Sequence, residues 1–261
     1  MLADLTAGAV EDARTREEQF PLQIVEQRAA QQQPARDARA ALAPAERIKV
    51  IAEVKRASPS RGDLAAIPDP AHQAGLYEQG GASAISVLTE QRRFKGSLSD
   101  LSAVKAAVSL PVLRKDFIAT RYQVFEARAA GADLVLLIVA ALDQSTLREL
   151  FALVTELGMT ALVEAHSADE VARAVDIGAQ IIGVNARDLT TFELDRDLFG
   201  RLSASIPAGV VKVAESAVKT PADVAHYRAA GADVVLIGEA LVTGDPVTTL
   251  HTFLNHPEET P

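Results

Sequence analysis

Four segments of this chain begin with a Gly-Ala pair and continue into a short, mostly apolar run. Their glycines are Gly81, Gly131, Gly178 and Gly231, so successive copies lie 50, 47 and 53 residues apart. Each pair follows an amphipathic stretch, which predicts a helix that ends at the glycine and a buried strand after it. A repeat of this length indicates a fold built from one supersecondary unit used several times.

Four further apolar runs lie between these copies, at residues 48–55, 111–115, 160–164 and 210–215. Interleaving the two sets gives eight strands, each followed by a helical pattern of about 10–15 residues. Strands that alternate with helices form a parallel sheet covered by helices. Eight such units in roughly 210 residues predict a closed (β/α)8 TIM barrel, an α/β fold, with a doubly wound open sheet as the alternative.

Residues 1–45 do not follow this pattern, because they are rich in Ala, Gln, Glu and Arg and are interrupted by Pro34 and Pro44. We expect residues 1–45 to form a helical N-terminal extension that packs on the barrel and covers one of its ends. A separate partner-binding arm is the alternative. Residues 46–261 are expected to form the catalytic barrel domain, with residues 251–261 fraying into a tail.

Charge and composition restrict the classes of partner. Lys and Arg number 26 against 35 Asp and Glu, and the net charge of −9 repels nucleic acid and anionic membrane surfaces. The chain has no cysteine, which excludes disulfides and thiolate sites, and its five histidines lack metal-ligand spacing. We expect all five histidines at the surface or at helix caps.

No stretch of about 18 uncharged apolar residues is present to span a membrane, and the first residues lack the apolar core of a signal peptide. We therefore expect a cytoplasmic protein with no bound metal, no cofactor, no nucleic-acid partner and no membrane partner. A monomeric state is compatible with the sequence.

Charged residues occur inside the predicted strands, where burial on both faces makes an unpaired charge costly. Side chains alternate along a strand, so residues two apart share a face. Each odd-numbered strand ends with an ionisable residue two positions after an apolar one: Glu53 after Ile51, Lys115 after Leu113, Glu164 after Leu162, and Glu215 after Val213. Because alternate barrel strands contribute to one layer, these four are expected to form a charged layer at the C-terminal mouth, with Lys55 just above it.

Other polar residues near the strand ends fall outside this layer. Arg114 and Lys212 are out of phase and are expected to face the helices. The even-numbered strands carry no comparable charge, although the sixth ends in Asn185 and Arg187 follows in its loop. A ring of opposite charges shifts pKa values and is a common way to prepare an acid and a base.

A phosphate site is expected at the same mouth, because the loops after strands seven and eight bind phosphate in many such barrels. Ser216 follows strand seven, and Gly238 and Glu239 follow strand eight. The loop after strand one, residues 55–62, adds cations, hydroxyl groups such as Ser58, and flexibility. Together these loops predict a small, anionic, phosphorylated substrate.

The chain resembles the indole-3-glycerol phosphate synthase family over residues 48–242. The resemblance rests on an ordered set of motifs: IAEVKRASPS (51–60), LRKDF (113–117), LVE (162–164), IGVNARDL (182–189), AES (214–216) and LIGE (236–239). It implies ring closure of 1-(2-carboxyphenylamino)-1-deoxyribulose 5-phosphate, with loss of carbon dioxide and water, to indole-3-glycerol phosphate.

The same resemblance implies roles for the matching residues. Lys115 would be the general acid at the ribulose carbonyl, held by Glu53, and Glu164 would be the general base. Lys55 would contact the anionic groups of the substrate and act in dehydration. Asn185 and Glu215 would hydrogen-bond the sugar hydroxyls, and Ser216, Gly238 and Glu239 would lie at the phosphate. Phe94 and Phe117 would pack on the anthranilate ring, and Arg187 would supply positive charge to the anionic substrate.

Two positions depart from the commonest family pattern. Ala217 stands where Gly usually follows Glu-Ser, so a positive φ there would cost energy. Ala186 replaces the second Asn of a frequent Asn-Asn-Arg form and removes one hydrogen bond. Neither position carries a proton-transfer group, so both bear on substrate binding rather than on the reaction.

Three alternative interpretations remain open at this point. Phe94 and Phe117 could be core aromatics under a loop rather than ring contacts. Lys115 or Lys55 could form a Schiff base, as in an aldolase, although the sixth strand has no lysine. The barrel could also be a catalytically silent ligand-binding subunit, but Glu53, Lys115 and Glu164 are all present.

Overall fold

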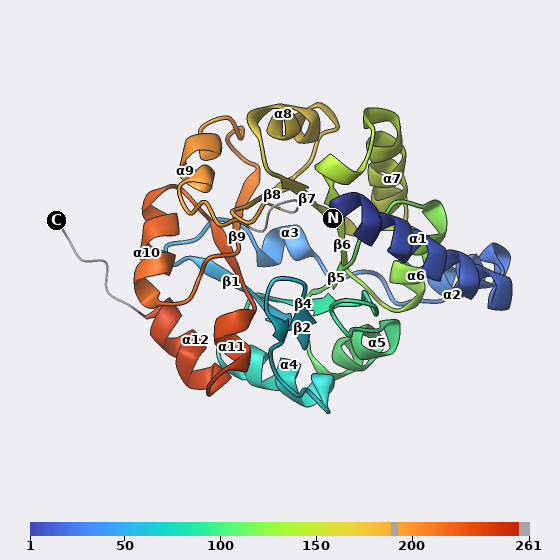
Figure 1. Cartoon of the computed structure of the whole chain (residues 1–261), viewed down its shortest axis with the longest axis horizontal. Helices are drawn as coiled ribbons and strands as arrows, with labels where there is room; N and C mark the ends of the chain where they lie inside the picture. The colour runs from blue at the N-terminus through green and yellow to red at the C-terminus, as the bar shows by residue number, and fades with distance from the viewer. Residues whose placement is uncertain (189–192, 256–261) are drawn as a thin grey trace.

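Eight parallel strands close into a barrel in the computed structural model, which describes residues 1–188 and 193–255. Figure 1 shows this ring of strands with helices around it. The barrel strands are, in order along the chain, β1 (Lys49–Val54), β4 (Ala84–Leu88), β5 (Val112–Lys115), β6 (Leu134–Ile138), β7 (Thr160–Ala165), β8 (Ile181–Asn185), β9 (Val211–Glu215) and β10 (Val234–Ile237). Neighbours along the chain pair in parallel, and β10 closes the ring on β1. The prediction of a (β/α)8 barrel is confirmed, and the open sheet is excluded.

Helices separate successive strands. The outer ring consists of α4 (Pro70–Gln79), α5 (Leu98–Ala107), α6 (Arg121–Ala129), α7 (Gln144–Glu156), α8 (Ala168–Asp176), α9 (Leu198–Ser203), α10 (Pro221–Ala229) and α12 (Pro246–Leu254). Two short helical segments follow strands: η1 (Val139–Ala141) and α11 (Glu239–Val242). Asp, Ser or Thr side chains cap most of the outer helices at their N-termini, as in the capping boxes at Thr120 and Thr220.

The four repeated glycines end helices as expected. Gly81, Gly131, Gly178 and Gly231 have φ values between 80° and 94°. Glycine adopts this left-handed region without the steric penalty of a Cβ atom, and the following amide bonds back to the helix. Each repeat therefore turns its helix sharply into the next buried strand.

The sheet separates two apolar clusters. One lies between the strands and the outer helices, and the other fills the inside of the barrel. Ile51, Leu113, Leu162 and Val213 all belong to the inner cluster. The residue two positions after each of them therefore also points into the barrel, which confirms the phase on which the charged layer was predicted.

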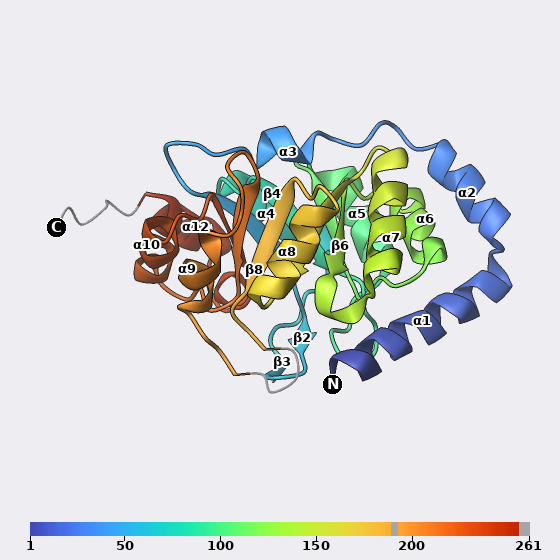
Figure 2. The same ribbon diagram turned by 90° about the horizontal axis from the view of Figure 1, so that it is seen from above.

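The first 45 residues contain three helices, α1 (Leu2–Gln19), α2 (Leu22–Ala30) and α3 (Ala38–Ala41). Figure 2 places α1 at one end of the barrel and α3 at the opposite end. Leu5 of α1 and Leu42 after α3 both join the inner cluster, and Lys49 donates a hydrogen bond of 2.7 Å to the carbonyl of Ala41. The segment thus reaches both ends of the barrel rather than one. The domain boundary at residue 46 stays a prediction.

The loop after β1 has more order than the sequence indicated. Its β2 (Ala57–Ser58) and β3 (Gly62–Asp63) strands pair in antiparallel fashion at the end of the barrel where α1 lies. Gly62, with φ of 69°, makes the return turn possible. Residues 251–254, which were expected to fray into a tail, form the end of α12 instead. The end of the 182–189 motif and residues 256–261 of the predicted tail lie outside the described residues. Within the described part, no helix is long and apolar enough to cross a membrane.

Candidate active site

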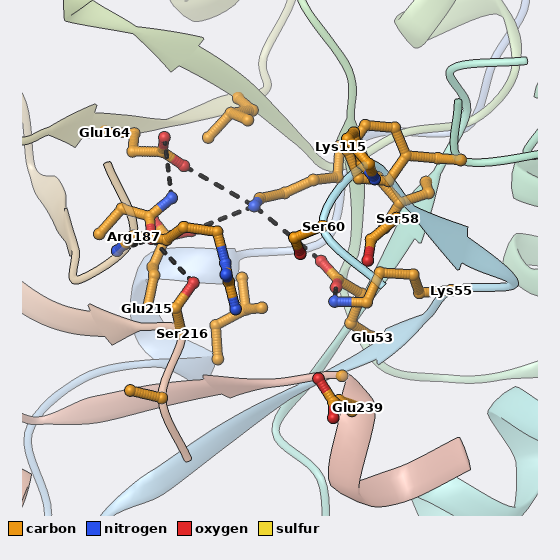
Figure 3. Close-up of a pocket in the computed structure, with 18 of the residues that line it drawn as sticks. Glu53, Lys55, Ser58, Ser60, Lys115, Glu164, Arg187, Glu215, Ser216 and Glu239 are labelled. Carbon is orange, nitrogen blue, oxygen red and sulfur yellow. Dashed lines mark hydrogen bonds and ion pairs between the residues drawn. The ribbon is translucent and has the colours of Figure 1, made fainter. Parts of the chain in front are cut away.

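The four predicted layer residues meet at the carboxyl ends of the strands, around the amine of Lys115 (Figure 3). Its Nζ atom lies 3.2 Å from Glu215 Oε2, 3.7 Å from Glu164 Oε2 and 3.9 Å from Glu53 Oε2. The three carboxylates are buried, whereas 15% of the Lys115 side chain is exposed. One cation is thus held among three acids at the floor of an open pocket.

Lys55 forms a second cationic centre beside this layer. Its Nζ lies 2.7 Å from Glu53 Oε1, so Glu53 contacts both lysines through its two oxygens. Gly238 leaves room for this pair: a Cβ at that position would lie 2.6 Å from Glu53 Oε1 and 2.8 Å from Lys55 Nζ. Ser86, which the sequence analysis passed over, is buried in the same layer and donates to Glu53 Oε2 at 3.4 Å.

Asn185 connects Glu164 in the charged layer to the loop after β9. Its Nδ2 donates to Glu164 Oε1 at 3.2 Å. Its Oδ1 accepts the Ser216 hydroxyl at 2.8 Å and the Arg187 amide at 3.0 Å. This pattern fixes the orientation of the amide and links Glu164 on β7 to Ser216 in the loop after β9.

The balance of burial and neighbouring charges lowers the pKa of one layer residue, Glu53, and raises the pKa values of two others, Lys115 and Glu215. Burial opposes ionisation of Glu53, but Lys55 and Lys115 outweigh it and hold the pKa of Glu53 below its usual value. Burial also disfavours the charged form of Lys115, yet Glu215, Glu164 and Glu53 raise its pKa. Burial together with the neighbouring Glu164 raises the pKa of Glu215 to about 8 against the pull of Lys115. Lys115 therefore stays a proton donor, while the layer holds a carboxyl group that is easily protonated.

Replacing Glu215 with glutamine is expected to stabilise the fold more as the pH rises. The unfolded chain ionises Glu215 above pH about 4.5, but the folded chain resists ionisation up to pH about 8. Stability is therefore lost across this interval, by at most about 1.4 kcal/mol per pH unit. The Glu215→Gln variant escapes this loss, so thermal melts at pH 5 and pH 8 should show its Tm advantage growing by several degrees.

Glu53→Gln provides the opposite control, because the folded state lowers the pKa of Glu53. The stabilising effect of Glu53 is present above its unfolded pKa and is lost as the pH falls through the folded one. That variant should therefore melt lower than the parent at pH 8. A constant Tm difference for Glu215→Gln at both pH values would contradict the assignment.

The predicted phosphate residues surround one side of the same pocket. Ser58, Arg187, Ser216, Gly238 and Glu239 all line it. Glu239 is itself paired with Arg61 at 2.9 Å, so its negative charge is compensated. Gly238 has φ of −120°, and its missing side chain serves the Glu53–Lys55 pair rather than a special backbone angle.

Ala217 adopts the positive φ that the sequence analysis marked as costly. Its φ is 59°, and Ser216 before it has φ of 71°. The Ala217→Gly variant should therefore gain about 1 kcal/mol, because only glycine enters this region freely. In a chain of this size that gain corresponds to about 2–4 °C in Tm. Ala230→Gly, at a helix end with φ of −77°, is the matched control and should lower Tm instead.

The apolar side of the pocket holds the two predicted aromatic residues. Phe94 and Phe117 lie with ring centroids 6.1 Å apart and both line the pocket, as does Leu5 of α1. Glu90 accepts the amide of Phe94 at 2.9 Å, and Asp116 accepts that of Phe117 at 2.8 Å. The two rings line the pocket, and they also belong to the core: Phe117 is buried in the inner cluster and Phe94 packs against it.

Arg114 and Lys212 face the helices, as predicted. Arg114 is fully buried and contacts Asp116 at 3.0 Å and the carbonyl of Gln123 at 2.7 Å. The side chain of Lys212 extends to α9, where its Nζ donates a hydrogen bond to the carbonyl of Ser203. Arg114 therefore helps to hold the segment that carries Lys115 and Phe117.

His166 does not have the surface or capping role expected of all five histidines. Its ring is largely buried, with Nε2 3.4 Å from Glu164 Oε1 and Nδ1 3.3 Å from Glu170 Oε2. The alternation of side chains along a strand indicates this position, because residue 166 is two positions after Glu164 and so faces the same way. Among the others, His72 and His251 are exposed on helices and His226 lies beside Asp197 at 3.4 Å, while His256 is outside the described residues. The described side chains contain no group of three His, Cys, Asp or Glu arranged to hold a metal ion.

Comparison with known proteins adds a family to this geometry. A family model described as indole-3-glycerol phosphate synthase matches residues 2–253. A protein of that name from Leifsonia xyli is 72% identical over 253 residues, covering 97% of each chain. Another from Beutenbergia cavernae is 58% identical and covers 94% of this chain and 92% of the relative.

Two solved structures of low identity share the fold. An N-acetylmannosamine-6-phosphate 2-epimerase from Clostridium perfringens aligns with a TM-score of 0.61 at 16% identity, covering 77% of this chain and 90% of its own. A thiamine phosphate pyrophosphorylase from Pyrococcus furiosus aligns with a TM-score of 0.60 at 14% identity, covering 83% and 96%. At these identities the likeness supports the barrel fold alone.

Proposed function

The chain belongs to the indole-3-glycerol phosphate synthase family, and from that premise we propose how its residues divide the work of the reaction. The protein is a carboxy-lyase of tryptophan biosynthesis. It closes the ring of 1-(2-carboxyphenylamino)-1-deoxyribulose 5-phosphate and releases carbon dioxide and water to give indole-3-glycerol phosphate. The observation that carries the proposed roles is the amine of Lys115, held among three buried carboxylates at the pocket floor.

Lys115 is the general acid of ring closure. The substrate must fold so that the carboxyl-bearing ring carbon meets the ribulose carbonyl carbon, and negative charge then develops on the carbonyl oxygen. A proton from Nζ neutralises that oxygen as the carbon–carbon bond forms. The raised pKa of Lys115 and its contact with Glu53 support this role, because they keep the amine protonated and directed into the pocket.

Glu164 is the general base of the later steps. Loss of carbon dioxide restores the benzene ring, and removal of a proton and a hydroxyl group then completes the indole. Glu164 Oε2 lies 3.7 Å from the amine of Lys115, so acid and base lie close together in the same pocket. Lys55, anchored to Glu53, supplies positive charge to the anionic groups and acts in the departure of the hydroxyl group.

The remaining pocket residues hold the substrate. Asn185 and Glu215 bind the sugar hydroxyls, and Ser216, Gly238 and Glu239 surround the phosphate, with Ser58 and Arg187 completing that side. Phe94 and Phe117 pack on the anthranilate ring, which the apolar wall formed with Leu5 supports. The whole chain carries a net charge of −9, so the positive charge that holds the anionic substrate must come from local residues such as Arg187, Lys55 and Lys115.

The Schiff-base alternative is disfavoured by the same arrangement. An imine forms from an uncharged amine, whereas three carboxylates favour the cationic form of Lys115. The amine of Lys55 is itself occupied by an ion pair with Glu53 Oε1 at 2.7 Å. Both amines are therefore better placed to give protons than to attack a carbonyl group.

Incubation of the purified protein with the carboxyphenylamino substrate tests the activity directly. Indole fluorescence and carbon dioxide should appear together in equal amounts. Folded protein that yields neither would contradict the assigned reaction. We also propose that the chain works as a monomer in the cytoplasm, for which size-exclusion chromatography with light scattering and fractionation of the source cells are the direct measurements.

A further inference from the structure

A row of three ionisable side chains leads away from the proposed base. Glu164 Oε1 lies 3.4 Å from His166 Nε2, and His166 Nδ1 lies 3.3 Å from Glu170 Oε2. The exposed fraction of the side chain rises along the row, from 2% at Glu164 to 14% at His166 and 19% at Glu170. The row therefore runs from the barrel interior toward the first turn of α8.

Glu170 determines which ring nitrogen of His166 carries hydrogen. Burial opposes ionisation of Glu170, but its contacts with His166 and Ser167 outweigh burial and lower its pKa. An ionised carboxylate only accepts hydrogen bonds, so His166 must donate from Nδ1. The backbone amide of His166 also donates to Glu170 Oε2 at 2.8 Å, which holds the two residues together. In the neutral ring, Nε2 is then left with a lone pair that faces Glu164.

Glu164 must give up the proton that it takes in each turnover before it can act again. Among the described groups near its oxygens, the Asn185 amide can only donate. Lys115 can take the proton back once it has given its own in ring closure, but that transfer keeps the proton inside the pocket. Glu215 resists ionisation up to pH about 8 and so already holds a proton, and it is as deeply buried as Glu164. His166 Nε2 is buried and has no hydrogen-bond partner in the described structure, so it has a free position for a proton.

We propose that His166 is the proton outlet of Glu164, with Glu170 as the residue that fixes its tautomer. This inference rests on the proposed role of Glu164 as the base. The O–H bond on Glu164 breaks as an N–H bond forms at Nε2, giving an imidazolium stabilised by Glu170. The N–H bond at Nδ1 then breaks as the proton passes to Glu170, which releases it to solvent water. The ring is left with hydrogen at Nε2, and exchange of that proton for one at Nδ1, the position that Glu170 favours, restores the starting tautomer.

The outlet should also leave a mark on the pH profile. Burial opposes protonation of His166, but Glu170, Glu164 and Glu215, the charged groups that face the ring from α8, β7 and β9, raise its pKa above the usual value. Below that pKa the ring already holds its second proton and cannot take another. The kcat of the parent should therefore fall on the acidic side through a step that a His166 variant lacks.

The His166→Gln variant tests the proposal, because glutamine fills similar space but carries no proton. In dilute buffer its kcat should fall about tenfold with KM nearly unchanged, and added imidazole should restore most of the loss. The parent should not respond to imidazole. Glu170→Gln should show a smaller loss with the same rescue, and His226→Gln, which removes a histidine paired with Asp197 on the outer ring, is the control.

Two results would overturn the outlet. One is a His166→Gln enzyme with parental kcat and an unchanged acidic limb; the other is a loss of activity that imidazole does not restore in protein shown to be folded by circular dichroism. The base itself is tested separately by Glu164→Gln, which imidazole should not rescue. An inactive Glu164 variant beside a normal His166 variant would refute the outlet alone, whereas an active Glu164 variant would refute the base.

Discussion

Replacing Lys115 with alanine is expected to lower kcat by at least about a thousandfold while the substrate still binds. The amine is the proposed proton donor at the ribulose carbonyl, and its removal leaves Glu53, Glu164 and Glu215 without the cation between them. Carbon dioxide and indole fluorescence should disappear together, because ring closure precedes both. Binding persists because Lys55 and the phosphate-side residues remain.

Stopped-flow fluorescence and calorimetric titration measure the two halves of this prediction. Lys212→Ala is the matched control, because Lys212 is also a strand lysine but faces α9 and donates to the carbonyl of Ser203. It should retain turnover close to that of the parent. Near-normal turnover in Lys115→Ala would show that another group supplies the proton.

The Glu164→Gln variant should lose about a hundredfold to ten-thousandfold in kcat for indole formation, but for a different reason. Glutamine keeps the hydrogen-bonding shape beside Asn185 and cannot accept a proton. Ring closure and loss of carbon dioxide depend on Lys115, so carbon dioxide should appear before indole in a single turnover. Rapid-quench measurement of carbon dioxide beside fluorescence detects this separation.

Glu149→Gln, a change at an exposed position on α7, serves as the control for the loss of one carboxylate. It should leave both signals unchanged. If carbon dioxide and fluorescence slow equally in Glu164→Gln, Glu164 acts before decarboxylation and its assignment to the later steps is wrong.

Strand periodicity was sufficient to predict the barrel and its charged layer. The alternation that places Ile51 inside also places Glu53 inside, and the other three odd-numbered strands repeat this relation. The same rule applied to His166 would have found the neighbour of Glu164. That residue was missed because it was judged by metal-ligand spacing rather than by its phase in the strand.

Other features depend on tertiary contacts that no local pattern records. Leu5 reaches the pocket because α1 is fixed to α6 by Arg16, which contacts Glu126 at 2.5 Å, more than a hundred residues along the chain. Ser86 is a small polar residue in an apolar strand, and its role as a hydrogen-bond donor to Glu53 can be recognised only from the contact between the two side chains. The place of α3 at the far end of the barrel is set in the same way, by packing on the inner cluster.

The two attachments of α1 differ in a way that affects how kinetic constants of this enzyme can be compared. In the middle of α1, Glu11 and Asp12 contact Arg92 at the surface, whereas about one turn further along Arg16 pairs with the buried Glu126. The Debye length is about 10 Å at 0.1 M salt and shortens as salt is added, which weakens exposed ion pairs and affects buried pairs far less. Raising ionic strength therefore loosens the tip of the pocket wall as well as weakening attraction of the anionic substrate. KM values measured in buffers of different salt content thus report two effects, and only measurements at matched ionic strength are comparable.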